Sequence, residues 1–422
     1  MAAATTGQQV SRRAFLRGAG AAAACLAAGR LGAEAPAPAA AAPVNTALPA
    51  DWAHVRETFG LPGRTVHLNT GSLGLQPALV REAVTAAAAP LGVTPVGHFW
   101  GPLLQQAEAA RARAAAFLGC AVGELSFTDC TTDGMNQLAL GLDLAWGDHV
   151  LTTDQEHPGG SVCWEYLVRR RAIVVDRVKL PAAPVSGAEL VRLLTDAMTD
   201  KTRVISVSHV TYTTGLRLPV AALAALAHQR GAVPIVDGAQ AAGALAVDLH
   251  ALGCDAYATS GHKWLCGPAG TGLLYVAATA RERIAPLALT HGPAAYTGAT
   301  GTRNLPGAAG LGAALGLFAG LGAARIEEHN LALRARLIAQ LQTLPAAEVL
   351  SPPVPELASP LVTFRLRNGP PPDALEKRLL DEDGIAVKTV HGAFAGNRVS
   401  LHLYNDEADV ARLVAALQRR SP

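Results

Sequence analysis

Short apolar segments alternate with helical segments from residue 66 to residue 276, and this alternation limits the folds open to the chain. Between the apolar segments, residues 187–199 and 220–230 carry apolar side chains at helical spacing. Strands that alternate with helices form a mostly parallel sheet with helices on both faces. We therefore expect an α/β domain here, with strands at residues 150–153, 173–178, 204–208, 233–236, 256–259 and 272–276.

The C-terminal part of the chain predicts a second, smaller α+β unit. Strands are expected at 361–367, 385–390 and 399–404, and helices at 373–383 and 407–418, with Asn405 as the N-cap of the last helix. We thus expect an N-terminal arm at 44–65, a large domain at 66–307, and a linking helix with the small domain at 308–422.

The uncharged segment at residues 308–324 approaches the length of a membrane span. It consists mostly of Gly and Ala, and charged residues follow it directly. We interpret it as a tightly packed, buried helix of a globular protein, rather than as a transmembrane helix.

Composition narrows the function classes. The chain has 422 residues, of which 50% are hydrophobic and 16% charged, as in a globular protein. A formal net charge of +2 gives no basic surface for nucleic acid, so we expect no nucleic-acid partner. The 13 His include no HExxH or comparable ligand set, and we expect no metal site.

The N-terminus has the pattern of an export signal. Ser11-Arg12-Arg13-Ala14-Phe15-Leu16 is followed by a mildly apolar stretch and an Ala/Pro-rich region. We interpret residues 1–43 as a twin-arginine (Tat) signal peptide with its linker, which predicts export by the Tat machinery to the periplasm or another extracytoplasmic space. Cys25 lies in the apolar stretch, and we interpret it as a passive residue because the Ala-Ala-Ala before it is a weak lipidation signal.

The other five cysteines show neither CxxC nor metal-binding spacing. We expect them to be buried as small hydrophobic side chains. An oxidising compartment would permit a disulfide, and the spacing selects no pair.

Two neighbouring expected strands lead to a carboxylate and a lysine. The first ends at Asp237, and the second is followed by Ser260-Gly261-His262-Lys263. Ligands of such sheets bind at the carboxyl ends of the strands. A lysine amine can join covalently to the aldehyde of pyridoxal 5'-phosphate (PLP), while a carboxylate keeps its ring nitrogen protonated so that the ring accepts electrons. Lysine is rare here, at five of 35 basic side chains, and only a desolvated lysine can deprotonate for this task.

Further segments supply the remaining groups that this cofactor needs. Thr131, Thr132 and a glycine precede a helical run at 137–144, which suits a phosphate at a helix start. His157 follows an expected strand, and its imidazole is a candidate to stack on the pyridine ring. Each of these segments alone is ordinary turn or cap chemistry, and their value lies in occurring together.

Seven segments in this order resemble the class V aminotransferase family of fold-type I PLP-dependent enzymes, over roughly residues 60–415. The resemblance implies a large domain with a mostly parallel sheet sandwiched by helices, a small α+β C-terminal domain, and a homodimer with active sites at its interface. The matching segments are residues 68–74, 131–132, 156–157, 237–240, 260–263, 301–304 and 398–405.

The resemblance also implies roles for individual residues. Lys263 would carry the covalent link to PLP, Asp237 would pair with the ring nitrogen, and His157 would stack on the ring. Gln240 would reach the ring oxygen, and Arg398 would take the substrate α-carboxylate, with Asn69 as a second substrate-binding residue. The phosphate would be held by Thr131, Thr132, Ser260 and His262, and by Thr302 reaching the site of the partner subunit.

The branch within the family is less closely specified. The Tat-like N-terminus and the run from Asp154 to Gly160 resemble the isopenicillin-N-epimerase-like subgroup, which implies chemistry at the α-carbon of an amino acid or peptide-linked amino acid. An exported transaminating or decarboxylating tailoring enzyme, for example of a siderophore side chain, is the alternative. A PLP-binding protein without catalysis is disfavoured by the intact residue set.

Two features disfavour cysteine desulfurase activity. In desulfurases an Asn commonly follows the His-Val-Ser after the fourth strand, whereas Tyr212 follows His209-Val210-Thr211 here. Those enzymes need a nucleophilic cysteine shortly before the arginine, and residues 390–397 contain none. Epimerisation also needs an acid on the second face of the substrate, for which Tyr212, His98 and His391 are candidates.

Overall fold

The computed structural model describes residues 52–60, 65–181, 184, 186–286 and 301–420. Residues 46–422 form one compact unit, separate from residues 1–45, and everything described below belongs to it. The expected signal segment at 1–43, with Cys25, lies outside the described residues. The export prediction therefore stays a prediction.

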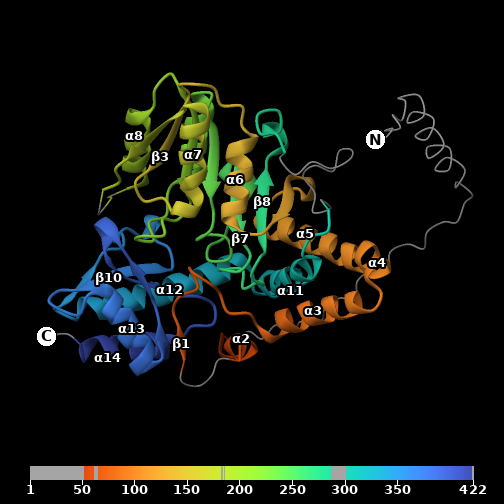
Figure 1. The fold of residues 1–422 in the computed structure, drawn as a ribbon. Coiled ribbons are helices and arrows are strands. Elements are labelled where there is room, and N and C mark those ends of the chain that lie inside the picture. The colour runs from red at the N-terminus through yellow and green to blue at the C-terminus, as the bar shows by residue number, and fades with distance from the viewer. Residues whose placement is uncertain (1–51, 61–64, 182–183, 185, 287–300, 421–422) are drawn as a thin grey trace, which may run out of the picture. The chain divides into compact units, whose positions relative to one another are not determined.

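A seven-stranded sheet forms the centre of the N-terminal half (Figure 1). Neighbouring strands from β4 to β7 run parallel, whereas β8 is antiparallel to both β7 and β2. The α/β prediction is confirmed, and β2 is a strand that the sequence analysis did not expect. In spatial order the strands are β2 (Leu125–Thr128), β8 (Gly272–Val276), β7 (Ala256–Ser260), β6 (Val233–Asp237), β5 (Thr202–Ser208), β3 (His149–Thr153) and β4 (Val174–Val178).

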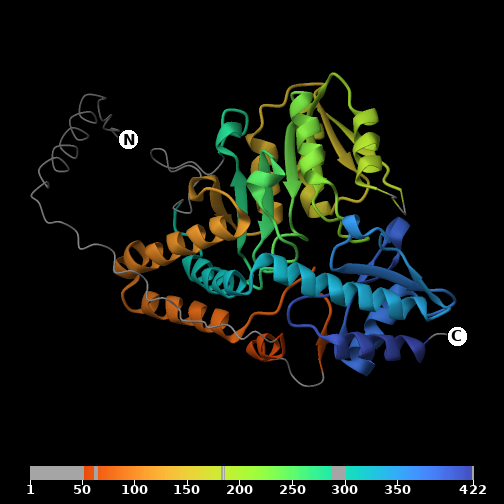
Figure 2. The same ribbon diagram turned by 180° about the vertical axis from the view of Figure 1, so that it is seen from behind.

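Alternate side chains of these strands enter two different cores. Val204 of β5 packs with Trp164 on the face covered by α6 (Thr131–Gly141) and α7 (Pro158–Arg171). The next residue, Ile205, packs with Leu223 on the face covered by α8 (Gly187–Ala197) and α9 (Val220–Gln229). Figure 1 shows α6 and α7 in front of the sheet, and the view from behind in Figure 2 shows α9 on the other face. The sheet is therefore apolar on both sides, as a buried parallel sheet requires.

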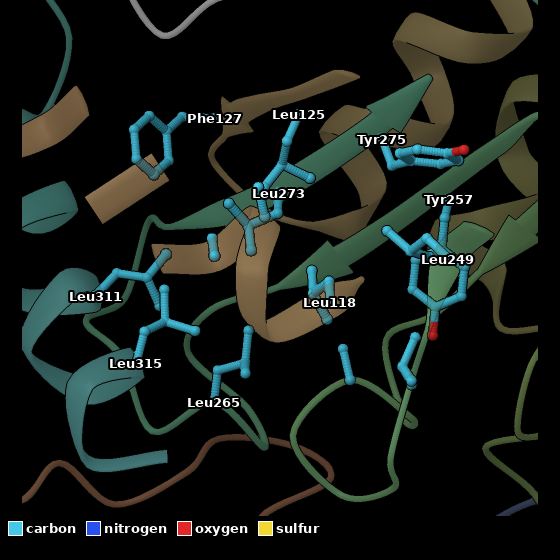
Figure 3. Close-up of a cluster of buried hydrophobic side chains, with 14 of the residues drawn as sticks. Leu118, Leu125, Phe127, Leu249, Tyr257, Leu265, Leu273, Tyr275, Leu311 and Leu315 are labelled. Carbon is cyan, nitrogen blue, oxygen red and sulfur yellow. The ribbon is translucent and has the colours of Figure 1, made fainter. Parts of the chain in front are cut away.

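A third core forms where α11 (Leu305–Leu321) packs against α3 (Ala78–Ala88) and α5 (Leu104–Leu118). Figure 3 shows Leu311 and Leu315 of α11 in this core, beside Leu273 of β8 and Leu265. The buried helix expected at 308–324 is confirmed, although it begins three residues earlier, where Asn304 caps it by accepting the Gly307 N–H at 2.9 Å.

Among the described helices, none alone has the length and apolarity to cross a membrane. Within the described part of the chain, the pair of α11 and α12 (Ala323–Gln342) passes that test, and the two helices are bent by 81° from each other. Because most of α11 is buried, its apolar surface is already covered by the protein.

The C-terminal part contains a four-stranded sheet in the order β12 (Lys388–Val390), β13 (Gly396–Ser400), β10 (Leu361–Leu366) and β9 (Ala347–Val349). It packs with helices α12, α13 (Pro372–Asp383) and α14 (Glu407–Gln418), as expected for a small α+β unit. The remaining short elements are α2 (Trp52–Thr58), η1 (Ala89–Gly92), α4 (Pro95–His98), η2 (Phe99–Leu103), η3 (Val122–Glu124), α10 (Leu249–Leu252), η4 (Ala278–Ala280), η6 (Pro355–Leu357) and η7 (Gly392–Phe394).

Three details of the sequence prediction for this part are wrong. The strand expected at 385–390 is divided between β11 (Ile385–Ala386) and β12, which pair in different sheets. The strand expected at 399–404 ends at Ser400. The N-cap of α14 is Asp406, which accepts the Asp409 N–H at 2.9 Å, because the Asn405 amide instead accepts the His402 N–H and donates to Asp409.

The N-terminal strand β1 (Val66–His67) pairs in parallel with β11 near the other end of the chain. Val66 and Leu68 consequently lie in the core of the C-terminal part, although the sequence placed them at the start of the large domain. The predicted division at residue 307 stays a prediction, since residues 46–422 form one unit.

Candidate active site

A cavity of about 380 Å³ lies where the carboxyl ends of β6 and β7 face the C-terminal sheet. It brings together most of the residues that the sequence analysis selected. Nine of them line it, namely Thr131, Thr132, His157, Asp237, Gln240, Ser260, His262, Lys263 and Arg398.

Asp237 and Lys263 form the electrostatic centre of this cavity. Asp237 is the last residue of β6 and is only 5% exposed, and its Oδ1 accepts the Ala239 N–H at 2.9 Å. Burial raises the pKa of Asp237, and the Ala239 N–H and Lys263 partly oppose this. Burial lowers the pKa of Lys263, with the positive charge of Arg398 acting in the same direction and Asp237 opposing both. The lowered pKa increases the fraction of Lys263 that carries a neutral amine, which is the form that acts as a nucleophile or base.

His157 presents an exposed ring to the cavity from the N-cap of α7. Its Nδ1 accepts the Gly159 N–H at 3.0 Å, so the proton of the neutral ring lies on Nε2. Partial desolvation of the ring in the cavity, together with the charges of Lys263 and Arg398, lowers the pKa of His157 to about 4. The ring of Tyr212 stands edge-on to it, with ring centroids 4.9 Å apart. At neutral pH His157 is thus an uncharged aromatic ring, which suits stacking.

The start of α6 has the properties of a phosphate site. Cys130, at the N-cap, makes no side-chain cap bond, and Thr131 and Thr132 form the first turn of the helix rather than the loop before it. The hydroxyl of Ser260 lies 2.7 Å from that of Thr131 and accepts the Thr131 N–H at 3.0 Å. His262 Nδ1 is buried, with no hydrogen-bond partner among the described residues. Hydroxyls, a helix N-terminus and an unpaired imidazole nitrogen together fit the phosphate of PLP.

The first turn of α7 lies directly against the same groups. A Cβ added to Gly159 would lie 2.5 Å from Thr132 Oγ1, and one added to Gly160 would lie 2.4 Å from Asp237 Oδ2. Only glycine permits this approach, which sets the distance between His157 and the carboxylate.

Arg398 of β13 is buried, and its hydrogen-bond partners among the described residues are neutral. Its Nη1 donates to the Tyr212 carbonyl at 2.9 Å and its Nη2 to the Ser72 hydroxyl at 3.3 Å, while its Nε is buried and unpaired. Burial lowers the pKa of Arg398 to about 10. No carboxylate in the described part of the chain forms an ion pair with it, so the guanidinium is available to an anionic ligand.

The side-chain amide of Gln240 already makes two hydrogen bonds within the protein. Its Nε2 donates to the Gly71 carbonyl at 2.9 Å, and its Oε1 accepts the Trp264 Nε1–H at 2.8 Å. One N–H of the amide is left for the ring oxygen that the resemblance implied. Gln240 thereby also fixes the loop that carries Gly71 and Ser72 beside the arginine.

Two selected residues do not line the cavity. Asn69 lies one contact away, where its Oδ1 accepts the Ser72 hydroxyl at 2.7 Å and so supports the group that contacts Arg398. Thr302 is exposed outside this cavity, and its expected contact with the partner subunit's phosphate stays a prediction. Among the candidate acids for the second face, Tyr212 lines the cavity and His98 and His391 do not.

The structure adds residues that the sequence analysis did not assign. Gly71, Ser72, Lys388, Thr389 and Val390 line the cavity, together with Cys130. Gly71 and Ser72 lie inside the matching segment 68–74 but had been given no role. Lys388, Thr389 and Val390 reach the site only through tertiary packing, and the available signal for them was Arg398 on the neighbouring strand.

Glu156 is a further residue to which no role was given, although its pair with His157 was noted. It accepts the Thr153 hydroxyl at 2.6 Å and the Ser208 hydroxyl at 2.5 Å. Burial raises the pKa of Glu156 to about 7, the two hydroxyls oppose the shift, and the charge of Asp237 adds to it. Within the described residues, no group of three or more His, Cys, Asp or Glu side chains is arranged to hold a metal ion.

Comparison with known proteins places this geometry in a family. A sequence model of the family "Aminotransferase class-V" matches residues 91–413. The chain is 34% identical over 395 residues to isopenicillin N epimerase of Amycolatopsis lactamdurans, covering 88% of this chain and 98% of that one. It is also 31% identical over 398 residues to cysteine desulfurase of Escherichia coli O7:K1, covering 86% and 95%.

Solved structures agree with the fold. The cystine C-S lyase C-DES, in complex with its product cysteine persulfide, superposes with a TM-score of 0.79 at 28% identity, covering 86% of this chain and all of that one. A lysine-to-alanine mutant of C-DES, with glycine covalently linked to its PLP cofactor, gives a TM-score of 0.78 at 28% identity, covering 87% and 99%. With Lys263, Asp237 and the unpaired Nδ1 of His262 in one cavity, the residues here fit PLP. The chain belongs to the class V aminotransferase family and is a PLP-dependent enzyme.

Proposed function

We propose that this enzyme acts at the α-carbon of an amino acid or peptide-linked amino acid and, like isopenicillin N epimerase, changes the configuration there. The observation that carries the proposal is the buried guanidinium of Arg398, which forms no ion pair within the described residues and lies in the same cavity as Lys263 and Asp237. A buried cation without a counter-ion is costly, and the α-carboxylate of a substrate would offset that cost. The relatives at 32–34% identity named isopenicillin N epimerase support the choice of branch.

Different residues of the site serve in substrate binding and in proton transfer. Bound PLP supplies an electron sink for the electron pair left at the α-carbon. Arg398 holds the carboxylate, and the lowered pKa of Lys263 suits its amine to remove the α-proton. His157 stays uncharged at neutral pH and so adds no positive charge above the ring. Asp237, buried and fixed by the Ala239 N–H, offers a carboxylate to a protonated ring nitrogen.

Epimerisation requires a proton donor on the second face of the α-carbon. Tyr212 is the candidate, because it lines the cavity beside His157 and its backbone carbonyl holds Arg398. Its hydroxyl would donate a proton to the face of the α-carbon opposite the one from which Lys263 removes a proton. Without such a donor the same residues would support transamination, or decarboxylation if the carboxylate leaves instead.

The test is a panel of amino acids and short peptides incubated in deuterated water with the holoenzyme. Deuterium at the α-carbon with loss of chirality supports the proposal. Keto acid or carbon dioxide in stoichiometric amounts would replace it with the tailoring alternative, and the absence of α-carbon exchange with every member would contradict the proposal. Tyr212→Phe is the informative variant, since it should retain exchange on one face and lose racemisation.

Cysteine desulfurase activity is the second candidate. The comparisons do not distinguish desulfurase activity from epimerase activity, because cysteine desulfurases match the chain at an identity similar to that of isopenicillin N epimerase. The segment 390–397 lacks a cysteine, but Cys130 lines the cavity and is the sole cysteine among the described residues to do so. Formation of alanine from cysteine, with the sulfur held as a persulfide on Cys130 until an added thiol reductant releases it as sulfide, would establish this activity if Cys130→Ala abolishes it.

We also propose that the enzyme is a homodimer exported by the Tat pathway. The family resemblance supports the dimer, and Arg12-Arg13 with the apolar stretch after it supports export. Sedimentation of the purified protein tests the first point. Cell fractionation of the full chain and of an Arg12→Lys, Arg13→Lys variant tests the second, and a variant that is exported normally would contradict it.

A further inference from the structure

A second cation stands beside Arg398 in the active-site cavity. Lys388 of β12 is the direct antiparallel partner of Arg398 of β13. Directly opposite residues of an antiparallel pair project from the same face of the sheet, about 4.5–5.5 Å apart at Cβ. Both residues line the cavity. The strand register therefore places an ammonium and a guanidinium side by side.

Neither cation of this pair forms an ion pair with an acid in the described part of the chain. Like charges directly opposite each other destabilise a sheet. Lys388 takes part in none of the ion pairs of the described residues, and Arg398 has only neutral partners. The charge of Glu376 acts on Arg398 without a direct contact between the two side chains, and Glu376 Oε2 accepts the Thr389 N–H at 2.6 Å. Asp373 instead lies 3.7 Å from His391.

The two cations differ in depth. Arg398 is 3% exposed, whereas Lys388 is an exposed residue that also lines the cavity. Arg398 therefore lies at the inner end, near Asp237 and Lys263, and Lys388 lies toward solvent. One carboxylate at Arg398 would leave the lysine unmatched. A ligand with a second acidic group, directed outward, would match both charges.

We propose that the substrate carries a second carboxylate on its side chain or at its far end, and that Lys388 recognises it while Arg398 holds the α-carboxylate. This inference rests on the proposed function and narrows its substrate class to dicarboxylic amino acids or peptides with an outward carboxylate. Lys388 is in this account a specificity residue, which takes no part in proton transfer.

The experiment measures binding through the change in cofactor absorbance of the holoenzyme. The ligands are pairs of equal chain length, 2-aminohexanoate with 2-aminoadipate and 2-aminopentanoate with glutamate. Wild type should bind the dicarboxylic member more tightly. Lys388→Gln should lose about tenfold for that member and nothing for its partner, as expected for one charge-assisted contact. Lys388→Arg should restore the preference, and the distant exposed Lys201→Gln should behave as wild type.

A second readout separates this inference from the proposed function. Adipate and glutarate, which lack an amine, are titrated by calorimetry against the holoenzyme, with hexanoate and pentanoate as controls. A dicarboxylate preference that depends on Lys388 supports the inference even if no amino acid reacts. Equal binding of both members of each pair by wild type would overturn it. So would an equal loss for both members in Lys388→Gln, or a loss of PLP affinity alone, which would assign Lys388 to the cofactor.

Discussion

The carboxylate of Asp237 and the amine of Lys263 line one cavity because β6 and β7 are adjacent parallel strands. Asp237 ends the first strand, and Lys263 lies three residues beyond Ser260, the end of the second. Each side chain shifts the pKa of the other toward its charged form, against the larger effect of burial. Because the two charges influence each other, a cofactor that binds between them would change the protonation of both side chains.

Substitution of Lys263 by Ala should abolish covalent attachment of PLP. Reduction with borohydride should fix the cofactor to wild type and not to the variant, as measured by mass spectrometry of the intact protein. Turnover should fall by about 10²- to 10⁴-fold or more, since the α-carbon base is also lost. Lys201→Ala serves as the control, and cofactor fixed to Lys263→Ala would contradict the assignment.

Substitution of Arg398 by Gln should act mainly on substrate binding. Loss of a buried, two-pronged contact costs about 3 kcal/mol, which raises KM about 100-fold and changes kcat less. Steady-state kinetics on the best amino acid of the panel would measure the two parameters separately. A fall in kcat with unchanged KM would show that Arg398 does not hold the substrate.

Glu156 should make stability depend on pH in an unusual direction. Its pKa in the folded protein, about 7, lies above the value of 4.5 for an exposed glutamate. The stabilising protonated form is fully present below pH 4.5 and is lost as pH rises through 7. Glu156→Gln should therefore raise the unfolding free energy at pH 8 by about 2 kcal/mol and have little effect at pH 4.5. Denaturant unfolding at both pH values measures this, and a variant less stable at pH 8 would contradict it.

His157 should contribute as an uncharged ring. Because its pKa is about 4, below the ordinary 6.5, the neutral form that stabilises the fold is fully present above pH 6.5 and is lost as pH falls through 4. His157→Phe should keep PLP affinity within a few-fold, whereas His157→Ala should lose about 1 kcal/mol of stacking. Fluorescence titration of the apoenzyme with PLP measures both. Equal losses in the two variants would exclude stacking as the role.

Gly160 should tolerate no side chain. The Cβ of Gly160→Ala would meet Asp237 Oδ2 at 2.4 Å, so the carboxylate or the start of α7 must shift and PLP affinity should fall about tenfold or more. Gly316→Ala is the matched control, because nothing lies within 4 Å of its added Cβ inside α11. That substitution should stabilise the protein by about 0.5–1 kcal/mol. Thermal unfolding and PLP titration distinguish the two.

Much of the large sheet and of the cofactor site was predictable, because both depend on local patterns. The apolar runs that end at Asp237 and Ser260 gave the strands, and the strand order placed their ends together. Antiparallel β2 was missed because Leu125–Thr128 is short and carries two hydroxyl side chains. Lys388 was missed because its position beside Arg398 depends on the register of β12 with β13, and a register follows from tertiary packing. The division of 385–390 between two sheets has the same origin.

The contact between Ser72 and Arg398 spans 326 positions of the chain. During translation, Lys263 is therefore synthesised long before Arg398. The loop of residues 69–72 is synthesised earlier still, and its partner Arg398 comes near the end of the chain. A chain interrupted before residue 398 would hold the reactive amine without the arginine that receives its substrate. The contact that fixes the loop of residues 69–72 beside the substrate arginine therefore cannot form until β13 has been synthesised.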